Sequence, residues 1–262
     1  SELREKVSNF DVLQRTVSED ALSDLEMPRL IDPPRGPGVR NFVAAPQSGL
    51  IFIPVPGGPR AEIEVWLAKR EMVCGGDLVR EMTQKQLREL RTAGPDARSF
   101  TVLRHPLLRA FTTFCDVTSP RSKDYRPKIQ ALLERRFGLG EQTGEDTLVE
   151  RRQAFLAFLR FLKATIAGQS GVGLAPSWRS QLSILQGISR VTLPDFLLRE
   201  ERTGTNLGVL PNPGSSAGPL RAPHDIVKDL DGIYDGTVEK AARSVYGRDY
   251  AAFGFTDWNA GS

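Results

Sequence analysis

An arginine and a threonine in this chain have the residue types and the spacing that suit an anionic ligand. Arg104 follows the apolar run Phe100–Leu103, which predicts a buried strand, and precedes Pro106, which favours the first turn of a helix. We therefore expect Arg104 at the carboxyl end of a strand, where open α/β sheets bind ligands and a guanidinium suits a phosphate. Thr112 follows about two helical turns later and could add a hydroxyl donor. A surface arginine and a helix-face threonine are the alternative interpretation.

A second anion-binding pattern lies earlier in the chain. The apolar run Leu50–Pro56 predicts a buried strand, and Gly57, Gly58 and Pro59 lead from it into a segment with helical spacing. A strand, a glycine-containing loop and a helix can surround an anion with loop N–H groups and the helix N-terminus. A plain tight turn has the same pattern, so this alternative stays open.

The elements that must position these residues follow from apolar spacing. We expect helices over residues 61–72, from about Thr83, over a segment bearing Ile129 and Leu133, and over Leu148–Ile166, the longest. Residues 1–41 are expected to form a helical or irregular arm. Val12–Leu13 contribute to its apolar stripe, and residues 18–20 look like a helix start. Residues 42–262 are expected to form one α/β domain.

The composition is that of an ordinary globular protein, and it argues against a membrane-spanning or a nucleic-acid-binding chain. Of the 262 residues, 40% are hydrophobic and 26% charged, and no apolar run approaches the ~20 residues that span a bilayer. We expect a cytoplasmic protein.

The cysteines and histidines show no metal-binding or disulfide pattern. Cys74 and Cys115 are expected to be small buried thiols. His105 is expected to hydrogen-bond locally and His224 to open the last helix facing solvent. The net charge of +3 suits an anionic ligand but is too small to indicate nucleic acid.

Five short motifs, taken in order, resemble those of the carbohydrate-type, membrane-associated sulfotransferases and their bacterial relatives. The string RHPLLRAFTTF, residues 104–114, resembles the family's R-H/D-P-x-x-R-x-x-S-x-Y/F segment. Residues 178–181 resemble its H-W-x-P/S-Q segment, with Ser177 where histidine often stands. Three later segments resemble its acidic strand, its N-x-S loop and its C-terminal helix: residues 193–210, Asn212–Ser216 and Tyr246–Phe255. The resemblance covers about residues 42–256.

The resemblance implies a fold, a reaction and two binding residues. It implies an α/β, P-loop-like three-layer fold with a central, mainly parallel sheet flanked by helices. The strands Leu50–Pro54, Phe100–Leu103 and Phe196–Leu198 are expected to be neighbours. The implied reaction transfers a sulfuryl group from 3′-phosphoadenosine 5′-phosphosulfate (PAPS) to a hydroxyl, with a carbohydrate the expected acceptor. The family's first arginine and later serine bind the 3′-phosphate, and these roles fall on Arg104 and Thr112.

The 5′-phosphosulfate loop departs from the family pattern P-K-T/A/S-A/G-G/C/S-T/S-S/T. Gly57 stands at the position of the lysine, which in the family grips the phosphosulfate, and Ala61 and Glu62 stand at the hydroxyl positions. Arg60 is the nearest replacement for the missing cation and is expected in the first turn of the helix, after Pro59. With this degenerate loop, we expect residues 57–60 to bind the phosphosulfate and Arg60 to act in the lysine role.

The catalytic base is the least determined residue. Glu62 is the candidate because the first helical turn favours a carboxylate, although a nearby phosphate would repel it. Other acids lie within range by sequence: Glu64, Glu71, Asp77 and Glu81. Sulfuryl transfer needs positioning and charge stabilisation more than covalent chemistry, so no metal is expected.

Three other classes of protein are alternatives to an active sulfotransferase. A non-catalytic relative would keep the fold and bind a nucleotide or glycan, and the missing lysine favours it. A nucleotide kinase would need a G-x-x-x-x-G-K-S/T loop, which this chain lacks. A nucleic-acid module would need a basic stripe with aromatic residues between the cations. The expected partner is a small-molecule or glycan acceptor, and no nucleic acid.

Overall fold

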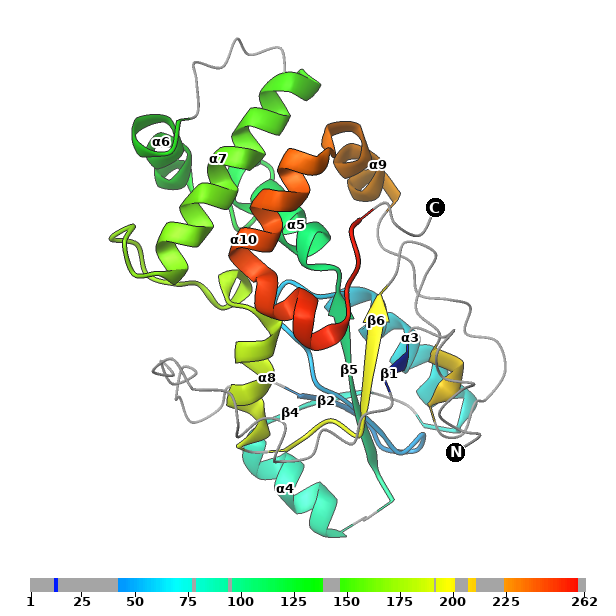
Figure 1. Ribbon diagram of the computed structural model, residues 1–262. Coiled ribbons are helices and arrows are strands. Elements are labelled where there is room, and N and C mark those ends of the chain that lie inside the picture. The colour runs from blue at the N-terminus through cyan, green and yellow to red at the C-terminus, as the bar shows by residue number, and fades with distance from the viewer. Residues whose placement is uncertain are drawn as a thin grey trace. The chain divides into compact units, whose positions relative to one another are not determined.

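The computed structural model describes residues 12–13, 42–76, 79–93, 96–138, 147–190, 192–200, 207–210 and 224–258 (Figure 1). The chain divides into two compact units. The sheet unit comprises residues 1–104 and 183–222, and the helical unit comprises residues 105–182 and 223–262. The predicted boundary between residues 41 and 42 stays a prediction.

The sheet unit contains a six-stranded mixed sheet of order β1-β6-β5-β3-β2-β4. Its strands are β1 (Val12–Leu13), β2 (Phe42–Ala45), β3 (Leu50–Phe52), β4 (Arg80–Met82), β5 (Arg98–Arg104) and β6 (Phe196–Glu200). The predicted neighbours β3, β5 and β6 do pair in parallel, and Figure 1 shows β5 and β6 side by side. The α/β class is therefore confirmed.

The expectation of a mainly parallel sheet is wrong, because β1, β2 and β4 all pair antiparallel. The cause is local for β2 and β3, which are joined by the short turn Pro46–Gly49. Gly49 has a φ of 67°, and its N–H donates to the Pro46 carbonyl at 3.2 Å. A turn this short can join only antiparallel strands, since parallel neighbours need a long crossover.

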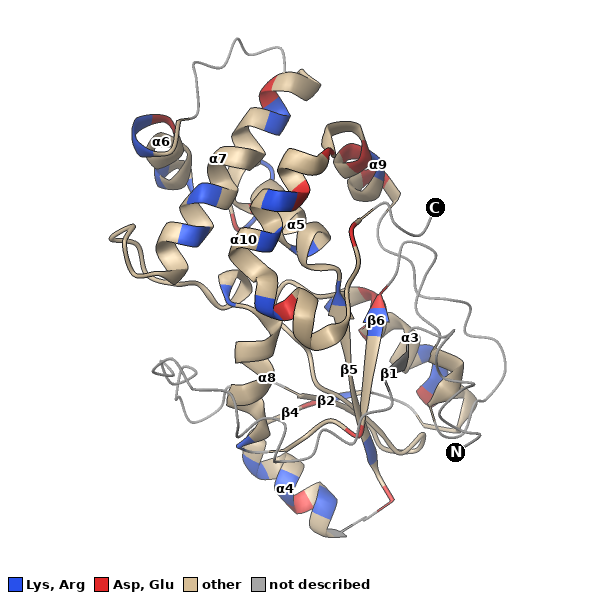
Figure 2. Cartoon of the chain, in the orientation of Figure 1, with Lys and Arg blue, Asp and Glu red and all other residues tan. Residues whose placement is uncertain are grey.

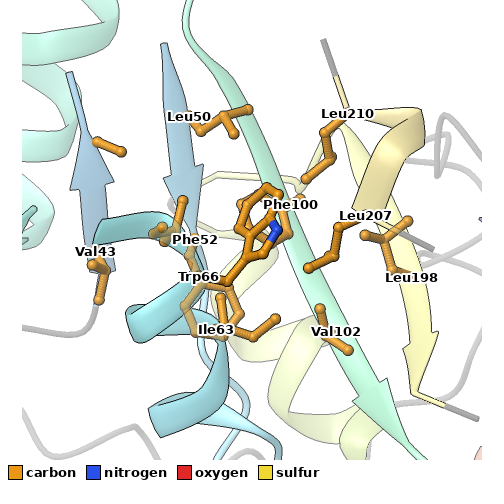
Figure 3. Packing of buried hydrophobic residues seen from close by; sticks show 12 residues of the cluster. Val43, Leu50, Phe52, Ile63, Trp66, Phe100, Val102, Leu198, Leu207 and Leu210 are labelled. Atoms are coloured by element: carbon orange, nitrogen blue, oxygen red, sulfur yellow. The ribbon is translucent and has the colours of Figure 1, made fainter. Parts of the chain in front are cut away.

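Helices cover both faces of this sheet. On one face, α3 (Arg60–Val73) buries Ile63, Trp66 and Leu67 in a cluster with alternate residues of the strands. Figure 3 shows Trp66 beside Phe100, and the two rings meet edge to face at 6.2 Å. On the other face, α4 (Gln84–Ala93) buries Leu87. The alternation of the strand side chains, with a period of two, produces these two clusters.

The helical unit contains the helices that follow β5. They are α5 (Pro106–Thr118), α6 (Pro127–Arg136), α7 (Leu148–Ile166), the 3₁₀ turn η1 (Pro176–Trp178), α9 (His224–Ile233) and α10 (Gly236–Phe253). Helix α8 (Gln181–Ser189) begins in this unit and continues in the sheet unit, which also holds the turn η2 (Leu207–Val209). The predicted bounds of α7 are confirmed, with Thr147 as its N-cap.

Four smaller expectations are wrong. Val12–Leu13 form strand β1 on the edge of β6 instead of part of a helix. Ile166 ends the apolar spacing of the longest predicted helix and was expected to face the core with it, but it is 40% exposed. His224 is exposed as expected but opens α9, not the last helix. Both cysteines are half-buried and free rather than buried.

No helix among the described residues is both long and apolar enough to cross a membrane. The expected helix start at residues 18–20 and the N-x-S loop at 212–216 lie outside the described residues.

Candidate functional site

The loop after β3 is a tight turn at the carboxyl end of the strand. The Gly58 N–H donates to the Val55 carbonyl at 2.8 Å, with Pro56 and Gly57 as the central residues. Gly57 has a φ of 80°. Proline followed by a residue with positive φ is the pattern of a type II turn, in which glycine is strongly favoured at the second central position. A lysine at position 57 would be strained in this turn.

Gly58 lets this loop lie against the neighbouring strand. A Cβ added at Gly58 would lie 2.9 Å from the Val55 carbonyl oxygen and 3.5 Å from that of Val102. Both neighbours are backbone atoms, so only glycine allows this close approach. Val102 is two residues before Arg104 on β5. The glycine loop and the end of β5 therefore lie at the same edge of the sheet.

Helix α3 starts at this edge with its N–H groups directed toward the loop. The helix begins at Arg60, with Pro59 as its N-cap residue rather than its first helical residue, so Arg60 lies in the first turn as expected. The Ile63 N–H donates to Pro59, but no hydrogen bond within the described part of the chain uses the N–H of Ala61 or Glu62. Such first-turn N–H groups and the positive end of the helix dipole attract anions. The Glu62 side chain is half-buried in the same turn.

The Arg60 guanidinium is held by two carboxylates. Its Nε lies 2.6 Å from Glu64 Oε1, one turn along α3, and its Nη2 lies 2.6 Å from Glu81 Oε1 on β4. The three side chains are 42%, 34% and 48% exposed. Exposed pairs of this kind contribute only about 0–1 kcal/mol, so an incoming anion can compete for Arg60. Two candidate bases, Glu64 and Glu81, are thus partners of the candidate cation.

Another candidate base, Glu71, has a structural role. Its carboxylate is buried and accepts the N–H groups of Gln47 at 2.8 Å and Ser48 at 3.0 Å. These bonds satisfy the turn between β2 and β3. Asp77 lies outside the described residues. Among the candidate bases in the described part of the chain, Glu64 and Glu81 are paired with Arg60, and Glu71 is bound to backbone N–H groups. Glu62 is the one that has neither kind of partner there.

Arg104 lies at the carboxyl end of β5, as expected, but its guanidinium is buried in an ion pair. Arg104 is 4% exposed and its partner Glu200 is 0% exposed. The Arg104 Nε and Nη2 donate to the two Glu200 oxygens at 2.5 and 3.0 Å. The two residues are register partners at the ends of β5 and β6. A bidentate buried pair of this kind has a fixed geometry.

The sequence interpretation did not single out Glu200 as the partner of Arg104. The signal was present, because Glu200 is two residues after Leu198, which is buried in the core. Alternate residues of a strand share a face, so an acid at position 200 points to the same side as that core residue. A buried acid requires a cation, and Arg104 supplies it.

Thr112 and Arg109 belong to the helical unit, and their hydrogen-bond partners lie within α5 and just after η1. The Thr112 hydroxyl donates to the Leu108 carbonyl at 2.9 Å, a bond within its own helix. Arg109 is 1% exposed, and its Nη1 donates to the Arg179 carbonyl at 2.7 Å. The expected nucleotide contact of Thr112 stays a prediction.

His105 caps α5, which confirms the expected local hydrogen bond. Its Nδ1 accepts the Leu107 N–H at 3.2 Å, and its Nε2 lies 3.0 Å from the Thr256 carbonyl oxygen. Since a carbonyl can only accept, Nε2 carries the proton and the ring is the Nε2–H tautomer. Three aromatic rings meet the imidazole edge to face: Tyr250, Phe255 and Trp258. This histidine has a structural role.

Two of the C-terminal motif residues hold the chain around η1. The Tyr246 hydroxyl donates to the Trp178 carbonyl at 2.8 Å. Asp249 accepts the N–H groups of Gln181 at 2.8 Å and Leu182 at 2.9 Å. Burial raises the pKa of the Asp249 carboxyl above its usual value. The positions of Tyr246 and Asp249 in the C-terminal motif are therefore explained by structural contacts, without a role in catalysis.

No family model, curated protein or solved structure matches this chain. Across the described ranges, no group of three or more His, Cys, Asp or Glu residues could hold a metal ion.

Proposed function

We propose that the chain is a PAPS-dependent sulfotransferase of P-loop-like, three-layer fold that acts on a hydroxyl-bearing acceptor, with a carbohydrate the favoured class. One observation carries the proposal. The glycine loop follows β3, and Arg104 is the last residue of the adjacent parallel strand β5. Both lie at one edge of the sheet, with the first turn of α3 beside them. This edge is where α/β sheets bind nucleotides.

The loop end of the site would bind the 5′-phosphosulfate. The N–H groups of Ala61 and Glu62 supply donors, and Arg60 supplies a cation if it exchanges its carboxylate partners for the phosphosulfate. Its pair with Glu81 is exposed and its pair with Glu64 is partly exposed, which supports such an exchange. Glycine at position 57 keeps the turn compact where the family has its lysine.

The other end of the site would bind the 3′-phosphate at Arg104. The Arg104 Nε and Nη2 donate to the Glu200 carboxylate. A phosphate there would approach the end of β5, with the Glu200 carboxylate as its electrostatic competitor. The role of Thr112 in this contact rests on the resemblance alone.

The proposed reaction moves one sulfuryl group. The acceptor oxygen forms a bond to sulfur while the bond from sulfur to the bridging oxygen of the 5′-phosphate breaks. Adenosine 3′,5′-bisphosphate leaves with that oxygen, and the acceptor proton passes to a carboxylate, for which Glu62 is the candidate. The negative charge that develops on the leaving phosphate is stabilised by Arg60 and the N–H groups of α3.

A second candidate function is binding of a nucleotide or glycan without catalysis. It is favoured by the carboxylate partners of both arginines and by the turn at Gly57, whose φ of 80° disfavours the lysine of the family. Transfer of sulfate from PAPS distinguishes the two functions.

Substitution of Arg60 tests the proposed cation. Arg60→Ala should lower PAPS turnover by on the order of 10²-fold, as expected for loss of one preorganised donor at a developing charge. It should weaken binding of adenosine 3′,5′-bisphosphate much less, because the 3′-phosphate is bound elsewhere. Turnover is measured as release of the bisphosphate in the presence of a panel of sugar acceptors.

Lys69→Ala is the matched control, since Lys69 is an exposed cation on the same helix. It should leave turnover unchanged. Glu81→Gln should raise turnover, because it removes one competitor for the guanidinium. Equal turnover of Arg60→Ala and wild type would refute the role of Arg60. No transfer by wild type to any acceptor would favour the non-catalytic function.

A further inference from the structure

The C-terminal segment, residues 254–258, leaves the axis of α10 and packs against the start of α5. Gly254 ends α10 in the left-handed region, with a φ of 66°, and the Phe255 N–H donates to the Tyr250 carbonyl at 3.1 Å. The segment then contacts His105, the N-cap residue of α5, through a hydrogen bond and two aromatic rings. All of these residues belong to the helical unit.

Trp258 anchors the far end of this segment and is 4% exposed. Its backbone N–H donates to Glu239 Oε2 on α10 at 3.1 Å, and its indole Nε1–H donates to Asp231 Oδ1 on α9 at 2.7 Å. The Trp258 ring lies 5.1 Å from the imidazole of His105 between centroids. The C-terminal segment therefore joins α9, α10 and the start of α5.

The hydrogen bonds of His105 fit only the neutral imidazole. Its Nδ1 accepts the Leu107 N–H at 3.2 Å, while its Nε2–H donates to the Thr256 carbonyl at 3.0 Å. A second proton would occupy Nδ1 and face the Leu107 N–H, so α5 would lose its N-cap acceptor. His105 is also 5% exposed, and a buried charge is costly where water cannot hydrate it.

The ionisable residues of the contact network around His105 come from α5, α9, α10 and the C-terminal segment, and Figure 2 shows acidic residues on the last three of these. They are Arg109, Asp231, Glu239, Arg243, Asp249, Tyr250 and Asp257, with Arg104 before His105 in the chain. Glu239 and Asp231 accept the Trp258 N–H groups, and Asp257 accepts Nε–H of Arg243 at 2.8 Å. Histidine is the only one of these residue types that ordinarily changes charge between pH 5 and 8.

We propose that His105 is a pH-dependent latch for the C-terminal segment. The neutral imidazole holds the segment closed on the start of α5. At lower pH, Nδ1 takes a proton from solvent, the Leu107 N–H loses its acceptor, and the cationic ring turns toward water. This movement breaks the contacts of the ring with Phe255, Thr256 and Trp258, and the segment opens.

The direction of the pH dependence follows from the protons that each state binds. The open state binds one proton more than the closed state, since the closed hydrogen bonds require a neutral ring. The closed state is therefore fully favoured above the ordinary histidine range. Below about pH 6.5, the equilibrium constant for closure should fall tenfold for each pH unit.

Tryptophan emission measures the opening of the segment. The chain has three tryptophans, and subtraction of the spectrum of Trp258→Phe isolates the emission of Trp258 from that of Trp66 and Trp178. Between pH 7.5 and 5.0 the Trp258 emission should shift to the red, reversibly and with the steepness of one proton. The helical circular dichroism signal should stay unchanged, because only the segment opens.

Histidine NMR supplies a second measurement that needs no change at Trp258. The chain has two histidines, so labelling with ¹³Cε1-histidine gives two resonances, and His224→Gln assigns them. The His105 resonance should show the Nε2–H tautomer at pH 7.5 and the imidazolium at pH 5.0. Its change should follow the same pH curve as the tryptophan emission of wild type.

His105→Asn tests whether this side chain causes the transition. The asparagine oxygen can accept an N–H at the start of α5, but the side chain does not titrate. This variant should keep the segment closed at pH 5.0 and show no shift in emission. His224→Gln is the matched control, because His224 is an exposed histidine of the same unit, and it should keep the transition of wild type.

Four results would overturn the proposal. They are a Trp258 emission that does not change between pH 7.5 and 5.0, a transition that persists in His105→Asn, an imidazolium at His105 with the segment still closed, and loss of the helical circular dichroism signal over the same pH range. The last result would mean that the whole unit unfolds. If His105→Asn does not fold, comparison of the NMR and emission curves of wild type decides.

Discussion

Arg104→Ala should lower the free energy of unfolding by about 3–5 kcal/mol, the largest effect that we expect from a single substitution at the candidate site. The reason is the burial of its partner, because Glu200 is 0% exposed and would keep a carboxylate without its cation. Urea unfolding at neutral pH measures the change. This effect is larger than the loss of phosphate affinity that the substitution would also cause.

The double variant Arg104→Met with Glu200→Leu is the control for this result. It replaces both charges with apolar groups of similar volume and should recover most of the lost stability. A loss below about 1 kcal/mol in Arg104→Ala would mean that the ion pair is weak or solvated in solution. The consequence for binding studies is that Arg104→Lys, which keeps the cation beside Glu200, is the better variant.

Asp249→Ala should cost about 3 kcal/mol or more of unfolding free energy in the helical unit. Asp249 is 0% exposed and accepts the N–H groups of Gln181 and Leu182, which would lose their acceptors. Buried Arg109, whose charge acts on the pKa of the Asp249 carboxyl, would also lose that nearby acid. Thermal and urea unfolding followed by circular dichroism measure the loss.

Asp124→Ala is the matched control for Asp249, because Asp124 is an exposed aspartate of the same unit. Its unfolding free energy should stay within about 0.5 kcal/mol of wild type. Equal stability of the two variants would show that Asp249 does not hold the chain around η1.

Strands and helices with a strong local pattern were predictable from the sequence. The apolar runs of β3 and β5, the proline at the start of α5 and the long apolar face of α7 each carry their own signal. The strands β2 and β4 carry no such local signal. FVAA is only four residues long, and REM on the sheet edge is mostly exposed and charged, so neither shows an alternating pattern. Their antiparallel pairing depends on contacts that a local pattern does not contain.

The candidate site was predictable in its positions but not in its partners. The glycine loop and Arg104 were placed correctly because the ends of strands are local features. Glu200 is 96 residues from Arg104, and Glu81 is 21 residues from Arg60. Which carboxylate meets which arginine depends on the order of the strands in the sheet. The sequence therefore indicated two cations for a nucleotide, whereas the structure shows each of them with an acidic competitor.

Calorimetry with adenosine 3′,5′-bisphosphate, adenosine 2′,5′-bisphosphate and AMP tests the proposed nucleotide site most directly, because it needs no acceptor. Contacts from Arg104 to the 3′-phosphate should contribute about 1.5–3 kcal/mol, as charge-assisted hydrogen bonds do. The 3′,5′-bisphosphate should therefore bind roughly 10- to 100-fold more tightly than AMP, and more tightly than its 2′,5′ isomer of equal charge. Equal affinities for the 3′,5′-bisphosphate and AMP, or for the two bisphosphates, would contradict the site.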